Sequence, residues 1–204
     1  MLDSLIVGVV RLLCGASVHW IGSRPEDRQR IYFANHTSHL DSVLLWSVLP
    51  REVRSRTRPV AARDYWTRGR LRQILATSVL HAVLIERRKV SARDHPLLPL
   101  LEALDQGASL ILFPEGTRGS GTGLLPFKSG LFHLARRRPA VEMIPVFIEN
   151  LNRILPKGEI LAVPLLCSVS FGEPLSVRSG EDKHSFLRRA RDAISRMQSS
   201  ESSC

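Results

Sequence analysis

Cysteine is scarce in this 204-residue chain, and its three residues lie far apart, at Cys14, Cys167 and Cys204. No CxxC pair occurs among them, so neither a disulfide framework nor a structural zinc site is expected. A reducing compartment suits this composition, and we expect the three thiols to be inert.

Long uncharged apolar runs are also missing. Residues 1–22 are mostly apolar, but Asp3 and Arg11 interrupt them, whereas a membrane-spanning helix needs about 20 residues with few charges. The segment lacks the positive start and small-residue cleavage site of a signal peptide. Apolar residues recur at helical spacing, at Leu5, Val9, Leu12 and Leu13. The pattern predicts a helix in the membrane interface, and a helix packed on the domain's own core would give the same pattern.

Acidic residues are too few to balance the basic ones. The chain has 19 Asp and Glu against 29 Lys and Arg, a net charge of +10. Such a chain favours a negatively charged partner: nucleic acid, an anionic membrane surface or a phosphorylated substrate. No nucleic-acid recognition motif appears, so we expect no nucleic-acid partner. The basic segments 51–72, 134–138 and 187–191 either bind anionic lipid headgroups or are solvated surface, and charge alone does not separate these readings.

Neither an internal repeat nor a linker divides the chain. We expect an apolar, interfacial helix over 1–22, one domain over 23–198 and a disordered tail over 199–204. Strands are predicted at 30–36, 81–88, 108–116, 141–150 and within 160–171, and helices at 38–49, 71–80, 95–107, 127–138 and 182–198. The Arg-rich stretch 51–59 is predicted to be a solvated loop. Strands that alternate with helices indicate a single α/β domain with a largely parallel central sheet flanked by helices.

Distinctive polar residues follow three of the predicted strands. His36 and Asp41 follow the first, Glu86 and Arg87 follow the second, and Glu115 to Arg118 follow the third. Ligands of parallel sheets bind beyond the carboxyl ends of the strands. We therefore expect these residues to form one site.

The stretch ANHTSHLDSV, residues 34–43, brings His36 and Asp41 close in sequence. Ser38-x-x-Asp41 matches a capping box, in which the acid only caps a helix that begins at Ser38. In such a case His36 lies in the turn before the helix and is able to meet Asp41. The carboxylate would then accept the Nδ1 hydrogen of His36 and leave Nε2 as a general base.

A metal site is a weaker interpretation of the same residues. His36, His39 and Asp41 would be the ligands of a zinc ion in a metal-dependent hydrolase. Adjacent turn residues seldom converge on one ion without a further ligand, and the other histidines show no HxxxH spacing. We expect His39 to face solvent and no metal to be bound.

The stretch FPEGTRGSGTGLLPFKSG, residues 113–130, joins the end of a strand to a glycine-rich segment. It does not match a Walker loop, because Thr122 occupies the first glycine position and Phe127 precedes Lys128. Glu115 and Arg118 nevertheless follow a buried strand directly, where a charged pair needs a reason.

Together these segments resemble the glycerolipid acyltransferases, the family of 1-acylglycerol-3-phosphate acyltransferases. NHTSHLD (35–41) resembles the family's NHxSxxD motif, and FPEGTR (113–118) matches its third motif. VLIER (83–87), LPFKSGLFHLA (125–135) and MIPVFI (143–148) resemble further motifs in the same order. The second motif departs from the family, which usually has a glycine where this chain has His81 and an aspartate in place of Glu86.

The resemblance implies an O-acyltransferase in phospholipid biosynthesis. Its donor would be acyl-CoA or acyl carrier protein, its acceptor the free hydroxyl of 1-acylglycerol-3-phosphate or another lysolipid, and no other cofactor is implied. His36 and Asp41 would be catalytic. The acceptor would be held by Arg87, Glu115, Gly116, Thr117 and Arg118, and a phosphate by Lys128. The expected location is the cytoplasmic face of the cell membrane, as a peripheral or monotopic protein.

Overall fold

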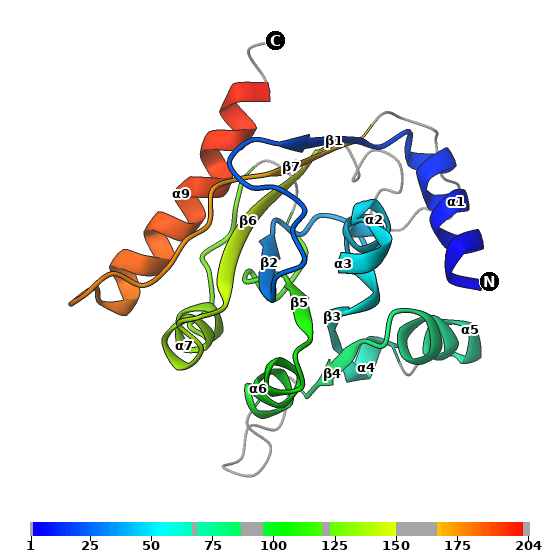
Figure 1. The fold of residues 1–204 in the computed structure, drawn as a ribbon, viewed down its shortest axis with the longest axis horizontal. Helices are drawn as coiled ribbons and strands as arrows, with labels where there is room; N and C mark the ends of the chain where they lie inside the picture. The colour runs from blue at the N-terminus through cyan, green and yellow to red at the C-terminus, as the bar shows by residue number, and fades with distance from the viewer. Residues whose placement is uncertain (1, 67–68, 87–95, 120–122, 150–166, 202–204) are drawn as a thin grey trace.

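A computed structural model describes residues 2–66, 69–86, 96–119, 123–149 and 167–201. These residues form one sheet of seven strands: β1 (Ser17–Trp20), β2 (Arg30–Ala34), β3 (Thr57–Ala62), β4 (Val83–Ile85), β5 (Ser109–Leu112), β6 (Glu142–Glu149) and β7 (Ser168–Phe171). The strand order is β1-β7-β6-β2-β5-β3-β4, and every neighbouring pair is parallel except β6 and β7 (Figure 1). The prediction of one α/β domain with a largely parallel sheet is confirmed.

Helices cover both faces of the sheet. They are α1 (Leu2–Cys14), α2 (Asp41–Val48), α3 (Arg51–Ser55), α4 (Arg63–Trp66), α5 (Arg70–Ile74), the π-helix η1 (Leu75–Val79), α6 (Leu98–Asp105), α7 (Gly130–Arg137) and α9 (Lys183–Glu201). Residues of α1 and α2 share one core cluster, and residues of α6, α7 and α9 share the other. The alternation of strands and helices along the chain is thus the alternation of sheet and covering layers.

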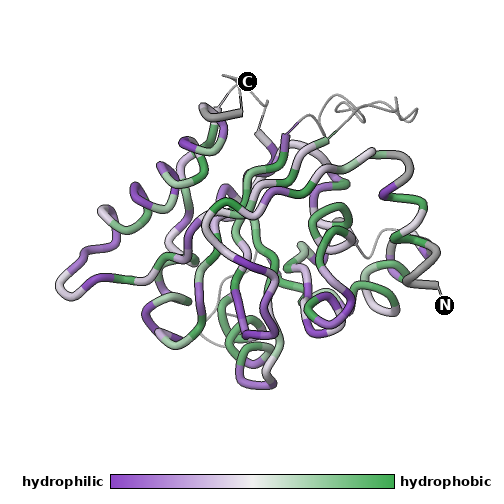
Figure 2. The backbone as a smooth tube through the Cα atoms, turned by 45° about the horizontal axis from the view of Figure 1, so that its top comes forward, coloured by the Kyte–Doolittle hydropathy of each residue, from purple (hydrophilic) through white to green (hydrophobic). Residues whose placement is uncertain are grey.

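Strand β2 shows how the sequence fills both layers. All five of its residues are buried. Tyr32 and Ala34 belong to one cluster, and Ile31 and Phe33 belong to the other, as the two-residue period of a strand requires. In Figure 2 the central strands are mostly hydrophobic, whereas α9 alternates between polar and apolar along its length. A strand buried on both faces reads as a continuous apolar run, which is why β2, β5 and β6 were predictable.

The N-terminal helix α1 packs on the domain's own core. Val7 and Cys14 are buried in the same cluster as α2, and Nε of Arg11 donates to the carbonyl oxygen of Ser47 at the end of α2. All eight residues of α2 are buried, so α2 needs the cover that α1 supplies. Val9 faces away from this contact and is 48% exposed. The side chains of Leu5, Leu12 and Leu13 lie outside the described part of the chain.

Several predicted boundaries were wrong. The helix predicted over 1–22 ends at Cys14, and Ser17–Trp20 instead pairs with β7 as an edge strand. The stretch 51–59 is not a loop, because α3 and the first half of β3 occupy it. Helix α9 continues through residues 199–201, which were predicted to be disordered. Across the described residues, no helix is both long and apolar enough to cross a membrane.

Two of the cysteines are neighbours, which their sequence positions concealed. Cys14 and Cys167 are both buried, and the N–H of Cys167 donates to the carbonyl oxygen of Cys14 across 3.0 Å. The side-chain hydrogen bond with Cys14, together with burial, raises the pKa of the Cys167 thiol. Cys167 therefore stays a neutral thiol, which fits the expected lack of reactivity.

Candidate functional site

A cavity of about 590 Å³ lies beyond the carboxyl ends of the central strands. His36 after β2, Ile85 at the end of β4 and Arg118 after β5 all line it. Of the residues predicted to meet at one site after these three strands, His36, Gly116, Thr117 and Arg118 line this cavity, whereas Glu86 and Glu115 are not among its lining residues. Arg87 lies outside the described residues.

His36 and Asp41 form a hydrogen-bonded pair at this cavity. Nδ1 of His36 lies 2.7 Å from Oδ2 of Asp41. An ionised carboxylate only accepts hydrogen bonds, so Nδ1 carries the hydrogen and Nε2 keeps its lone pair. The side chain of Asp41 is fully buried, whereas that of His36 is 17% exposed. The pair thus has a buried acid and an accessible imidazole, which is the arrangement of an oriented general base.

Asp41 also holds the turn, so the capping interpretation is correct in part. Its Oδ2 accepts the N–H groups of Thr37 and Ser38 at 2.7 and 2.9 Å. The helix begins at Asp41 rather than Ser38, and the Ser38 hydroxyl accepts from Leu40 instead of capping the helix in the predicted way. One carboxylate oxygen therefore serves the turn and His36 together.

The segment after β5 holds His36 from the other side. The imidazole stacks on the ring of Phe113, with centroids 4.3 Å apart and planes at 22°. The N–H of His36 donates to Oε1 of Glu115 at 2.8 Å, and its carbonyl oxygen accepts from the N–H of Gly119 at 2.8 Å. Oε2 of Glu115 accepts the N–H of Leu125 at 2.9 Å. Both loops of the site are thus joined through the backbone of the histidine.

Asn35, the residue before the histidine, fastens the same loop to β6. Its Nδ2 donates to the carbonyl oxygen of Ile148, and its Oδ1 accepts the N–H of Ile148, both at 2.8 Å. The side chain is buried, so these two bonds replace the water that an amide otherwise needs. Asn35 continues the β2–β6 pairing beyond the last strand residue and fixes where His36 begins.

Two cations stand at the cavity beside His36. Arg118 and Lys128 both line it, together with Gly116 and Thr117. Gly116 has φ +70°, and a Cβ there would overlap Cε of Lys128 and lie 3.3 Å from its Nζ. The missing side chain at residue 116 is therefore what lets Lys128 lie across this turn. Both cations and His36 therefore line one cavity.

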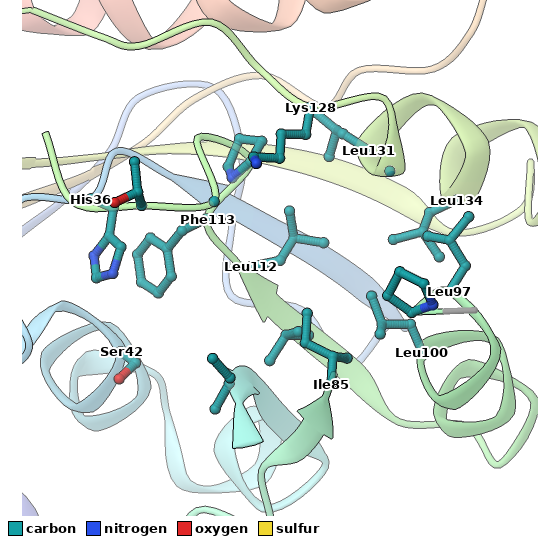
Figure 3. A pocket seen from close by; sticks show the side chains of 18 of the residues that line it. His36, Ser42, Ile85, Leu97, Leu100, Leu112, Phe113, Lys128, Leu131 and Leu134 are labelled. Atoms are coloured by element: carbon teal, nitrogen blue, oxygen red, sulfur yellow. The ribbon is translucent and has the colours of Figure 1, made fainter. Parts of the chain in front are cut away.

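The wall opposite His36 is apolar. Leu97 and Leu100 of the α6 region, Leu131 and Leu134 of α7, and Leu112 of β5 line it. In Figure 3 His36 and Phe113 lie at one end of the cavity, and Leu97, Leu100 and Leu134 lie at the other. Lys128 lies between them along the upper edge of that view. The cavity therefore has a polar end at His36 and an apolar end at these leucines, and a site for an amphipathic ligand needs both.

His39 was predicted to face solvent, but it is half-buried and lines the cavity from the turn before α2. Among the residues that the structure describes, no three His, Cys, Asp or Glu side chains gather closely enough to hold a metal ion. The Nδ1 of His36, one of the proposed zinc ligands, is already bonded to Asp41.

Comparison with known proteins places this site in a family. The family model described as Acyltransferase matches residues 16–149, about two thirds of the chain. The chain belongs to the acyltransferase family. This range includes the His36–Asp41 pair, Glu115, Arg118 and Lys128.

Curated acyltransferases of this family resemble the chain at modest identity. The 1-acyl-sn-glycerol-3-phosphate acyltransferase of Limnanthes alba is 27% identical over 173 residues, 84% of this chain and 59% of that protein. The enzyme of the same name from Salmonella typhimurium is 32% identical over 156 residues, 70% of this chain and 58% of that protein. The chain thus spans somewhat more than half the length of these relatives.

A solved acyltransferase shares the fold. The 1-acyl-sn-glycerophosphate (LPA) acyltransferase from Thermotoga maritima superposes with a TM-score of 0.74, over 99% of this chain and 82% of that one. The two sequences are 21% identical, so the likeness concerns the fold.

The departure in the acyltransferase second motif has a structural counterpart. His81 replaces the usual glycine and has φ +46°, the one positive value among described residues other than glycine. A glycine at this position adopts such a backbone without cost, whereas histidine tolerates it at some cost. Glu86 replaces the usual aspartate, and its Oε2 lies 3.9 Å from Nε of Arg63.

Sequence reasoning assigned no role to several residues that shape this cavity. Phe113 and Asn35 are the first residues of the motifs FPEGTR and NHTSHLD, and their place before a charged turn or a histidine was the available signal. The cavity lining of β3, Val60 to Ala62, was hidden because the stretch before it was predicted to be a loop.

Proposed function

We propose that this protein transfers a fatty acyl group from acyl-CoA or acyl carrier protein to the free hydroxyl of 1-acylglycerol-3-phosphate, which gives phosphatidate for phospholipid biosynthesis. The observation that carries the proposal is the His36–Asp41 pair at the polar end of a cavity that has two cations beside it and an apolar wall opposite. The names of the curated relatives support the acceptor.

The reaction needs a base and no covalent enzyme intermediate. Nε2 of His36 takes the proton of the acceptor hydroxyl as its oxygen attacks the thioester carbon. The C–S bond then breaks, and the thiolate leaves with the proton from the imidazolium. Asp41 stabilises that imidazolium and keeps the ring in the productive tautomer. Apart from the acyl donor as co-substrate, the step requires no cofactor.

Arg118 and Lys128 hold the acceptor's phosphate. A guanidinium binds two phosphate oxygens at once, and an ammonium adds a point charge. Both side chains line the cavity that His36 enters, so a phosphate bound there leaves the acceptor's hydroxyl beside the base. Arg87 and Thr117 complete this acceptor site in our proposal, on the strength of the motifs.

The apolar wall holds an acyl chain. Leu97, Leu100 and Leu134 lie at the end of the cavity away from His36 (Figure 3). An extended chain that starts at the thioester beside His36 runs toward them and buries its methylenes, each of which contributes about 0.8 kcal/mol.

The protein works at the cytoplasmic face of the cell membrane, as a peripheral or monotopic protein. Acceptor and product are both lipids, and α1 presents Val9 to its surroundings while its other face packs on α2. Helix α5, which exposes Ile74, lies at the same end of the molecule as α1 (Figure 1). Anionic headgroups and the basic surface add to this apolar contact.

A panel assay tests the proposal. Purified protein is mixed with vesicles that carry lysophosphatidate, lysophosphatidylcholine, lysophosphatidylethanolamine or monoacylglycerol, and with acyl-CoA or acyl carrier protein as donor. We expect the fastest transfer to lysophosphatidate. Faster transfer to a zwitterionic or neutral acceptor would assign another lysolipid as substrate, and hydrolysis without transfer would contradict the acyltransferase.

A further inference from the structure

We infer that Glu115 is a positioning residue, which holds the His36 loop and the segment leading to Lys128 in register, and that it does not bind the acceptor. The inference rests on the proposed function, because it assigns Glu115 a role in that reaction. It also differs from the acceptor-binding role that the motif resemblance implies.

Both carboxylate oxygens of Glu115 accept hydrogen bonds from backbone N–H groups. Oε1 accepts the N–H of His36 at 2.8 Å, and Oε2 accepts the N–H of Leu125 at 2.9 Å. Glu115 is 4% exposed, so water does not compete for these bonds. Charge-assisted hydrogen bonds of this kind are roughly twice as strong as neutral ones.

The Glu115 side chain is also outside the cavity lining. Its neighbours Pro114 and Gly116 line the cavity, and so do Thr117 and Arg118, but Glu115 itself does not. A carboxylate beside the acceptor's phosphate would repel it, since both are negative. Burial, bonding and charge therefore agree that Glu115 faces the protein.

Glu115 fixes the position of the His36 turn relative to the segment that leads to Lys128. His36 is reached by three groups of one segment: the Phe113 ring, the Glu115 carboxylate and the Gly119 N–H. Glu115 also binds the next segment, because its Oε2 accepts the N–H of Leu125. Lys128 follows three residues later, and its own N–H donates to the carbonyl oxygen of Pro114. The carboxylate thus sets the distance between base and phosphate site, where an error of about 1 Å costs as much as a hundredfold in rate.

Steady-state kinetics of Glu115→Gln test the role. Glutamine has the same shape but one accepting oxygen, and its NH₂ group faces one of the two N–H groups, so one bond is lost. We expect kcat to fall about tenfold to a hundredfold, with the KM values of acceptor and donor within about twofold of the unmutated protein. Glu102→Gln, which changes an exposed acid on α6, is the matched control and should leave both kinetic constants unchanged.

Two kinetic outcomes would overturn the inference. A higher acceptor KM with kcat retained would make Glu115 a ligand of the acceptor, and unchanged constants would remove it from the mechanism. An unmutated protein that transfers no acyl group to any acceptor would instead refute the proposed function and leave the next measurement to decide on Glu115.

Amide hydrogen exchange in the unmutated protein gives that second measurement, and it does not depend on the variant's folding or on turnover. The amides of His36 and Leu125 should exchange slowly, and lysophosphatidate in mixed micelles should leave their protection in place. Fast exchange at both amides, or protection that disappears when the lipid is added, would show that the carboxylate is free to leave them, and would refute the inference.

Discussion

The N–H of His36 donates to Oε1 of Glu115 across 2.8 Å, although the two residues are 79 positions apart in the chain. This bond joins the turn after β2 to the turn after β5, which are adjacent in the sheet. Asp41 orients the imidazole through Nδ1, and Glu115 orients the backbone that carries it. Two buried acids therefore position the base of the proposed reaction: Asp41 fixes its ring, and Glu115 fixes its backbone.

Gly116→Ala should disturb the phosphate site, because the new methyl group overlaps Lys128. Gly107→Ala is the matched control, since Gly107 has φ +81° and open space around it. Both changes should cost roughly 1–2 kcal/mol of unfolding free energy from the left-handed backbone. Only Gly116→Ala should also raise the acceptor KM, which steady-state assays measure; equal KM values for the two variants would remove Lys128 from acceptor binding.

Arg118→Lys should lower kcat/KM for lysophosphatidate about tenfold to a hundredfold. The substitution keeps the charge but loses the planar fork, and a lost charge-assisted hydrogen bond costs roughly 1.5–3 kcal/mol. A neutral monoacylglycerol should lose less, because it presents no phosphate. Equal losses for both acceptors would mean that Arg118 does not recognise phosphate and would favour a different lysolipid.

Leu100→Trp should shorten the acyl chain that the donor site accepts. Leu100 is buried and lines the apolar end of the cavity, so a larger side chain fills the space that the last methylenes need. Leu98→Trp on the same helix is the control, because Leu98 is 40% exposed. Turnover of donors of graded chain length measures the effect. An unchanged preference for chain length would place the acyl chain elsewhere.

Val9→Asp should weaken binding to anionic vesicles at least about tenfold, because it puts a negative charge on the exposed side of α1. Leu98→Asp adds the same charge to α6, away from α1 (Figure 1), and should bind almost normally. Co-sedimentation measures both. If the two variants bind equally well, α1 does not contact the membrane and only packs on α2.

The strands that are buried on both faces of the sheet could be predicted from the sequence. β2 and β5 are buried on both faces and read as apolar runs, whereas β3 was missed because Arg58 and Pro59 are unusual inside a strand of a buried sheet. β1 was missed because it is only four residues long and follows α1 closely, with Gly15 at the turn as the signal that separated them.

The candidate site was predictable where its residues are close in sequence. Local spacing was enough to propose the His36–Asp41 pair, since both residues lie in one turn. The bonds of Glu115 were not predictable, because they depend on how two distant loops pack. Proximity of Cys14 and Cys167 likewise arises only when β7 reaches the end of α1.

Turnover of His36→Ala with saturating lysophosphatidate and acyl donor tests the central claim most directly. The substitution removes the proposed base from a partly exposed turn, so the protein should keep its fold, as circular dichroism and its melting temperature would show. The account predicts that kcat falls about 10²–10⁴-fold, the usual contribution of a general base. Asp41→Asn should also reduce kcat strongly, although its remaining carbonyl oxygen still accepts from Thr37 and Ser38. Near-normal turnover by a folded His36→Ala protein would contradict the mechanism.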